Sequence, residues 1–178
     1  VLTSVTIPGS VTSIGGYAFA NCSGLTSLTI TNGVRSIDYN AFGSCGKLKN
    51  VTIPSSVTSI GDRAFSDCNG LKSINVDPKS VSYISENGVL LNYDKTILIQ
   101  YPAGKTDASY VIPDGVTRIY HRAFASCNGL TSVTIPSSVK SINSQVFDKC
   151  INLSNVYYEG TEKQWNNILS ASAEYLLC

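Results

Sequence analysis

Residues 48–68 read LKNVTIPSSVTSIGDRAFSDC, and this stretch is one unit of a repeat that runs through the chain. Its leading leucine recurs at a spacing of 23 residues, at positions 2, 25, 48 and 71 and again at 130 and 153. Nine positions match in several copies: leucine, two β-branched residues, proline, two further apolar residues, Ala-Phe and cysteine. Self-similarity at such a period is the signature of a repeat protein.

Each unit predicts one coil of a solenoid. In the segment Leu48-x-x-Val51-x-Ile53 the two β-branched residues are two apart, so they face the same side of a strand. Pro54 lacks an N–H and ends that strand. Stacked coils align like residues in one continuous core. The sequence therefore predicts a strand-rich leucine-rich-repeat solenoid with a 23-residue period, and with short helices or turns on its convex side.

Two repeat slots hold one residue type each. All five phenylalanines, at 19, 42, 65, 124 and 147, share one slot and are expected to form an interior column. Five of the six cysteines, at 22, 45, 68, 127 and 150, share another. Stacked side chains run parallel, which keeps the sulfurs side by side, so we expect buried free thiols. Cys178 lies outside the slot and is expected to be exposed and reactive.

The period fails in two places. Extra residues follow Leu71, where two apolar runs, 88–93 and 96–101, flank Asp94-Lys95 and predict a β-hairpin. Near the C-terminus, Thr161-Glu-Lys-Gln164 is a capping box that predicts a short helix laying Trp165 over the last coil. We divide this single domain into regular repeats (1–82 and 107–158), a hairpin insert (83–106) and a C-terminal cap (159–178).

Composition excludes several classes of function. The 178 residues carry 13 Lys and Arg against 12 Asp and Glu, so the net charge is +1 and nucleic-acid binding is not expected. No apolar run approaches the roughly 20 residues that span a bilayer, so this chain is not expected to insert into a membrane. Methionine is absent even at position 1, and we expect the chain to be a fragment of a longer protein.

Residue types that carry chemistry are sparse. There is no Cys-x-x-Cys pair or His-Cys cluster, so neither a metal site nor a cofactor is expected. The single histidine, His121, falls in a variable slot and is expected to lie on the surface. No Gly-x-Ser-x-Gly elbow accompanies it. We therefore assign no catalytic residue and do not expect an enzyme.

These units resemble the BspA-type (Treponema-type) leucine-rich repeats of bacterial surface proteins. The insert at residues 88–105 and the tail at 156–165, VYYEGTEKQW, are similar to recurring elements of the same family. The resemblance covers nearly the whole chain. It implies an extracellular or cell-surface protein of a host-associated bacterium that adheres to host or matrix proteins, and it brings no catalytic residues.

Candidate binding residues lie where the strand faces water or the period fails. The outward column of the repeated strand comprises Thr6, Thr29, Thr52, Asn75 and Thr134, and the insert adds Tyr83, Tyr93 and Tyr101. Tyrosine is common at binding hot spots. A second exposed column is mildly basic and would suit an acidic protein or a glycan; it comprises Arg35, Thr58, Arg118 and Lys140, with Arg63 and Arg122 in the adjacent loop slot. Protein binding is the leading hypothesis; a spacer that presents another domain and a glycan-binding module stay open.

Overall fold

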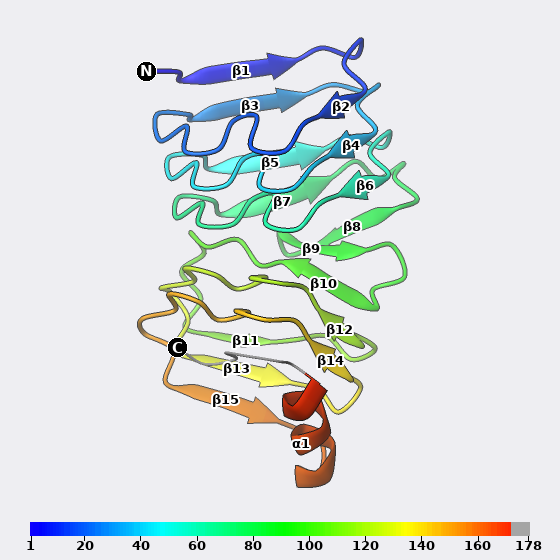
Figure 1. Ribbon diagram of the computed structural model, residues 1–178, viewed down its shortest axis with the longest axis vertical. Coiled ribbons are helices and arrows are strands. Elements are labelled where there is room, and N and C mark those ends of the chain that lie inside the picture. Colours follow the sequence, from blue (N-terminus) through cyan, green and yellow to red (C-terminus); the bar gives the residue numbers. More distant parts are fainter. Residues whose placement is uncertain (172–178) are drawn as a thin grey trace.

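The computed structural model describes residues 1–171, and in it the chain forms an elongated solenoid of stacked coils (Figure 1). Long strands form one side: β1 (Ser4–Ile7), β3 (Ser27–Ile30), β5 (Asn50–Ile53), β7 (Ser73–Val76), β11 (Ser109–Val111), β13 (Ser132–Ile135) and β15 (Asn155–Tyr158). Short strands form a second side: β2 (Ser13–Ile14), β4 (Ser36–Ile37), β6 (Ser59–Ile60), β12 (Arg118–Ile119) and β14 (Ser141–Ile142). The predicted leucine-rich-repeat solenoid is confirmed.

Strand pairing follows the repeat. β1 pairs in parallel with β3, and β13 with β15, and each residue lies opposite the residue 23 positions later. Inward-facing residues such as Val51 and Ile53 are fully buried, whereas Thr52 between them is exposed. Alternation of buried and exposed residues is the expected pattern for a strand with one face on the core.

The third side of each coil consists of turns. The sequence had predicted either short helices or turns on this convex side, and turns are what the structure contains. The turns contain left-handed backbone at two repeat slots, occupied by Tyr17, Asn40, Arg63, Arg122 and Gln145 and by Asn21, Ser44, Asp67, Ser126 and Lys149. Left-handed residues interrupt an α-helix, so no helix forms between them. Successive turns bond through the backbone instead, as where Phe19 N–H donates to Ala41 O at 2.8 Å.

The insert is a three-stranded antiparallel meander rather than a hairpin. The expected pair is present as β9 (Val89–Asn92) and β10 (Ile97–Gln100), and β8 (Tyr83–Glu86) adds a third strand. Asn87 and Gly88, both with positive φ, make the two-residue turn between β8 and β9. β10 then pairs in parallel with β12, so the meander continues the short-strand side of the solenoid.

The insert divides the interior into two hydrophobic cores. Strand β9 is buried on both faces: Leu90 packs into the N-terminal core, whereas Val89 and Leu91 pack into the C-terminal core. Strand β10 behaves in the same way, with Ile99 on the N-terminal side and Leu98 on the C-terminal side. The meander is therefore a layer shared between two stacks of coils.

The phenylalanine column is present, and the insert completes it. The ring centroids of Phe19 and Phe42 lie 5.3 Å apart, and those of Phe42 and Phe65 lie 5.6 Å apart. On the C-terminal side of the insert, Tyr101 lies one period before Phe124, and the centroids of the two stacked rings are 5.3 Å apart. The column is thus continued by a tyrosine where the repeat resumes.

The slot cysteines are free thiols with a specific partner. Cys45, Cys68, Cys127 and Cys150 are buried, and Cys22 is half-buried. The Cys45 Sγ donates to Phe19 O at 3.2 Å and the Cys68 Sγ to Phe42 O at 3.1 Å, in each case across 26 residues of sequence. The thiols therefore pack as small apolar groups and also satisfy a backbone carbonyl of the preceding coil. Cys178 lies outside the described residues.

The cap begins as predicted and is the helix α1 (Glu162–Ala171). Gln164 N–H donates to Thr161 Oγ1 at 3.2 Å, while Thr161 N–H donates to Gln164 Oε1 at 2.8 Å, which is the reciprocal capping box. The Trp165 ring lies 5.2 Å from that of Tyr158 in the last coil, and Ile168 is buried. The helix therefore covers part of the C-terminal core.

Candidate interaction surfaces

The outward column of the long strands is an exposed, uncharged ladder. Thr6, Thr29, Thr52 and Asn75 are exposed, and Thr134 is half-buried. Among residues 1–171, no side chain hydrogen-bonds to the four threonine hydroxyls; Asn75 reaches only Ser73 Oγ, at 3.4 Å. Parallel strands lie about 4.8 Å apart, so the hydroxyls recur at that interval. The ladder therefore presents threonine hydroxyls that make no side-chain hydrogen bond within the described residues.

Below the insert the same column becomes apolar. Val111 on β11 lies opposite Thr134, and Tyr157 on β15 lies opposite it on the other side. Val111 is 64% exposed and Tyr157 is 56% exposed. Sequence reasoning did not include Val111, although counting 23 residues back from Thr134 finds it. Exposed apolar residues of this kind are typical of surfaces that contact other proteins.

The three tyrosines selected in the insert have different roles. Tyr93 is 52% exposed, at the turn between β9 and β10. The Tyr83 hydroxyl accepts a hydrogen bond from Ile60 N–H at 2.9 Å, and desolvation raises the pKa of this tyrosine. Tyr83 therefore fastens the meander to β6, because its hydroxyl satisfies a backbone group there.

The expectation that Tyr101 faces a ligand is wrong. Its side chain is 1% exposed, because it occupies the phenylalanine slot of the core. Its hydroxyl donates to Asp107 Oδ2 at 2.9 Å, and burial together with this bond raises the pKa of Tyr101. Tyr101 therefore stabilises the first regular coil after the insert, and its buried side chain is not accessible to a ligand.

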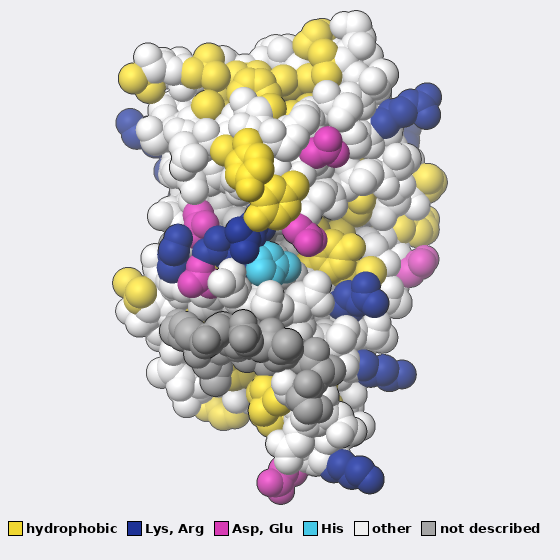
Figure 2. All heavy atoms as spheres, viewed as in Figure 1, with side chains coloured by type: hydrophobic (Ala, Val, Ile, Leu, Met, Phe, Trp, Pro, Cys, Tyr) yellow, Lys and Arg dark blue, Asp and Glu magenta, His cyan; other side chains and the backbone are white. Residues whose placement is uncertain are grey.

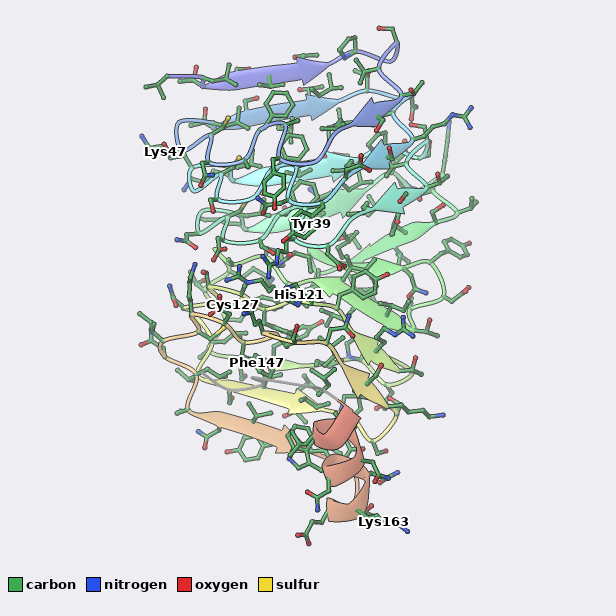
Figure 3. All side chains as sticks on the ribbon, viewed as in Figure 1. Tyr39, Lys47, His121, Cys127, Phe147 and Lys163 are labelled. Carbon is green, nitrogen blue, oxygen red and sulfur yellow. The ribbon has the colours of Figure 1, made fainter. Side chains whose placement is uncertain are left out.

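His121 is not a simple surface residue. It is half-buried, and the Arg63 Nε donates to its Nε2 at 2.9 Å. Because Nε2 accepts from the guanidinium, Nδ1 carries the proton and donates to Ser144 Oγ at 2.8 Å. Desolvation, followed by the charge of Arg63, lowers the pKa of His121. Figure 3 shows the imidazole on the turn side, between the two stacks of coils.

A second set of side chains joins the same two stacks. Ser126 Oγ donates to Asp67 Oδ1 at 2.6 Å, and Arg122 pairs with both Asp67, at 3.6 Å, and Asp148. Burial of Asp67 acts to raise the pKa of its carboxyl group. The hydrogen bond from Ser126 and the positive charges of Arg122 and Lys149 have the larger combined effect, so the pKa of Asp67 is lowered. Figure 2 shows this charged group beside the histidine.

We call these residues the turn-side clasp: Arg63, Asp67, His121, Arg122, Ser126, Ser144, Gln145, Asp148 and Lys149. Its bonds across the insert connect residues 55 to 82 positions apart. The expected exposed role of Arg122 is wrong, since its side chain is only 12% exposed and is held by two carboxylates. The clasp is a structural connection, and it removes Arg122 from the binding candidates.

An aromatic pair adjoins the clasp. Tyr17 is 61% exposed, and its ring lies 5.3 Å from that of Tyr39 in an edge-on arrangement. The Arg63 guanidinium lies 5.6 Å from the Tyr39 ring centroid, within cation–π range. The sequence pattern did not single out this pair, because neither tyrosine shares a slot with another.

Two kinds of feature are absent from the part of the chain that the structure describes. Residues 1–171 contain no group of three or more His, Cys, Asp or Glu side chains arranged to hold a metal ion. The same part of the chain contains no helix with the length and apolar character needed to cross a bilayer.

Comparison with known proteins agrees with this architecture. The family model described as the BspA type leucine rich repeat region matches in 6 copies, over residues 1–98 and 104–171. A search of curated protein sequences gives no match.

Three solved structures are similar over most of the chain. The pneumococcal vaccine antigen PcpA is 28% identical with a TM-score of 0.83, over 88% of this chain and 39% of that one. A leucine rich cell surface protein from Faecalibacterium prausnitzii is 28% identical with a TM-score of 0.59, over 99% of this chain and 64% of that one. A leucine-rich repeat protein from Eubacterium ventriosum is 26% identical with a TM-score of 0.60, over 90% and 55%.

This chain thus spans less than two thirds of the length of these three relatives. The match to the family model covers nearly all of it, at the residues that form the stacked coils. The chain belongs to the family of proteins with BspA-type leucine-rich repeats.

Proposed function

We propose that this chain is a protein-binding module of a bacterial surface or secreted protein, and that it adheres to host or matrix proteins through the outward face of its long strands. The observation that carries the proposal is the column itself. It runs from the free hydroxyls of Thr6, Thr29 and Thr52 to the exposed side chains of Val111 and Tyr157. Two similar proteins, a leucine rich cell surface protein and a pneumococcal vaccine antigen, support the location.

The column suits a protein partner better than a small molecule. It is flat and extended, and its outward side chains are uncharged, so an extended surface can contact several rungs without desolvating a charge. Tyr157 supplies a large ring with few rotatable bonds, which is the type of residue that dominates binding energy at interfaces. Tyr93 of the insert lies outside this column and is a second, independent contact point.

Biolayer interferometry on purified collagen, laminin and fibronectin tests the proposal. We expect one of these proteins to bind, and a Val111→Ser, Tyr157→Ser double variant to weaken that binding at least tenfold, about 1.4 kcal/mol. Tyr17→Ser is the matched control, because Tyr17 is equally exposed but lies on the turn side.

Three results would contradict the proposal. If none of the three proteins binds, while a longer form of the protein binds through another region, the chain acts as a spacer. If the chain binds oligosaccharides on a glycan array and none of the proteins, the glycan-binding alternative replaces this one. Equal weakening by the control and the double variant would place the binding face elsewhere.

A further inference from the structure

The last rung of the long-strand sheet is open at one edge. In the coil above it, Thr131 O accepts Ser154 N–H at 3.0 Å and Ile135 O accepts Glu159 N–H at 3.0 Å. The atoms one period later are Ser154 O and Tyr158 O, at the two ends of β15. Within residues 1–171, no N–H from another strand reaches either carbonyl, and β15 pairs only with β13.

A groove runs along this open edge. It has a volume of about 470 Å³ and is lined on the coil by Leu153, Val156 and Tyr158 and on the helix by Trp165. The equivalents of the three coil residues one period earlier, Leu130, Val133 and Ile135, are at most 1% exposed because the next coil covers them.

The cap covers this surface only in part. The helix α1 packs against β14 and inserts Ile168, whereas Leu153, Val156 and Tyr158 stay half-exposed. Figure 1 shows α1 at the end of β15, with the outer edge of the strand beside it. The uncovered residues are thus those whose equivalents in the preceding coil are covered by the next long strand and its coil.

Nothing in β15 blocks pairing. Sheet edges are usually protected by lysine, proline or a bulge. The residues Asn155–Tyr158 include neither lysine nor proline, and their register with β13 is regular. Glu162 lines the groove, so a segment with a lysine or arginine beside its apolar residues would be complementary in charge.

We propose that the edge of β15 and this groove bind an extended segment of a partner protein as an additional parallel strand. The segment has apolar residues at alternate positions, which enter the groove, and a basic residue near Glu162. Backbone hydrogen bonds to Ser154 O and Tyr158 O supply the pairing, as in other cases of strand addition. This site is separate from the outward column, because it uses the edge and the inward face of the strand.

A peptide of known fit tests the proposal. The probe is fluorescein-labelled Leu-Thr-Ser-Val-Thr-Ile-Lys-Lys, which places two lysines after the sequence of residues 130–135, at the end of β15 that precedes Glu162. Inside the solenoid that sequence pairs in parallel with the preceding long strand, β11, through the same edge that it would present to β15. We expect saturable binding in fluorescence anisotropy below about 1 mM, and no binding when aspartate replaces the central valine.

Variants of the protein separate this site from general adhesion. Val156→Lys puts a charge into the groove, and Glu162→Lys reverses the charge at its rim; we expect each to weaken binding at least tenfold. Tyr157→Lys is the matched control, since this residue is on the same strand but faces outward, and it should leave the affinity within twofold. Thermal unfolding of each variant checks that the coil is intact.

Hydrogen exchange on the unaltered protein gives a measurement that does not depend on any variant. The peptide should slow the exchange of amides in residues 154–159 and leave those of β1 unchanged. The proposal is overturned if the peptide does not bind, if its aspartate form binds equally well, or if the slowed amides lie elsewhere.

Discussion

Replacing Tyr101 separates a structural role from a binding role at the point where the repeat resumes. Its ring lies 4.9 Å from that of Tyr110 and 5.3 Å from that of Phe124, in the C-terminal core. Two substitutions divide its contribution: Tyr101→Ala removes the ring, and Tyr101→Phe removes only the hydroxyl. The hydroxyl's partner, the Asp107 carboxylate, is half exposed and can bond to water instead.

The two effects differ in size. Removing a fully buried aromatic ring costs about 3–5 kcal/mol, because the cavity is only partly refilled. Losing one hydrogen bond, with the partner resolvated, costs about 1 kcal/mol. For a chain of this size, 1 kcal/mol lowers Tm by about 2–4 °C, so Tyr101→Ala should lower it by roughly 6–20 °C.

Urea and thermal unfolding followed by circular dichroism measure both changes. Tyr93→Ala is the control, since that side chain is largely exposed, and it should change the stability by less than about 0.5 kcal/mol. The reasoning fails if Tyr101→Ala is as mild as Tyr93→Ala. It also fails if Tyr101→Phe costs as much as Tyr101→Ala, since the ring would then contribute nothing.

Three further outcomes can be checked. The pKa of His121 in the folded protein is below its ordinary value of 6.5, so the unfolded chain binds more protons in this range. The stability that His121 contributes is therefore complete above pH 6.5 and declines as the pH falls below that value. Urea unfolding at a series of pH values should show this decline, and the decline should disappear in His121→Gln. Burial raises the pKa of Cys127 well above its ordinary value, so this thiol should react with iodoacetamide only after denaturation; rapid native labelling, read by mass spectrometry, would contradict its placement. Gly88→Ala forces a side chain into left-handed backbone against β7 and should lower stability by about 1–2 kcal/mol in urea titration, whereas a neutral result would rule out this turn.

Much of the architecture follows from the repeat alone. The slots of leucine, phenylalanine and cysteine predict which side chains meet, because stacked coils place equivalent residues in contact. The capping box correctly predicted where α1 begins, because both of its hydrogen bonds join residues within a four-residue segment and do not depend on the rest of the fold. Tyr101 could have been placed correctly by counting one period back from Phe124; its neighbours in the tyrosine-rich insert obscured that register.

The candidate surfaces were less predictable. In the turn-side clasp, Arg63 contacts His121 and Asp67 contacts Arg122. The distance between the partners of each pair depends on how the meander packs between the coils on either side of it. No periodic pattern contains that information, because the insert occurs once. The change of the outward column to Val111 and Tyr157 becomes visible in the sequence when 23 residues are counted in each direction from Thr134.

The division of the interior into two cores has a consequence for how the molecule comes apart. In a stack where each coil couples only to its nearest neighbours, fraying that starts at one end can travel along the whole array. Here alternate side chains of the meander pack into the N-terminal and the C-terminal core, and the clasp connects the two stacks of coils on the turn side. Loss of the coils on one side leaves the other stack still covered by β9 and β10. The insert therefore serves each half as an internal cap, and fraying from either terminus should stop at the meander.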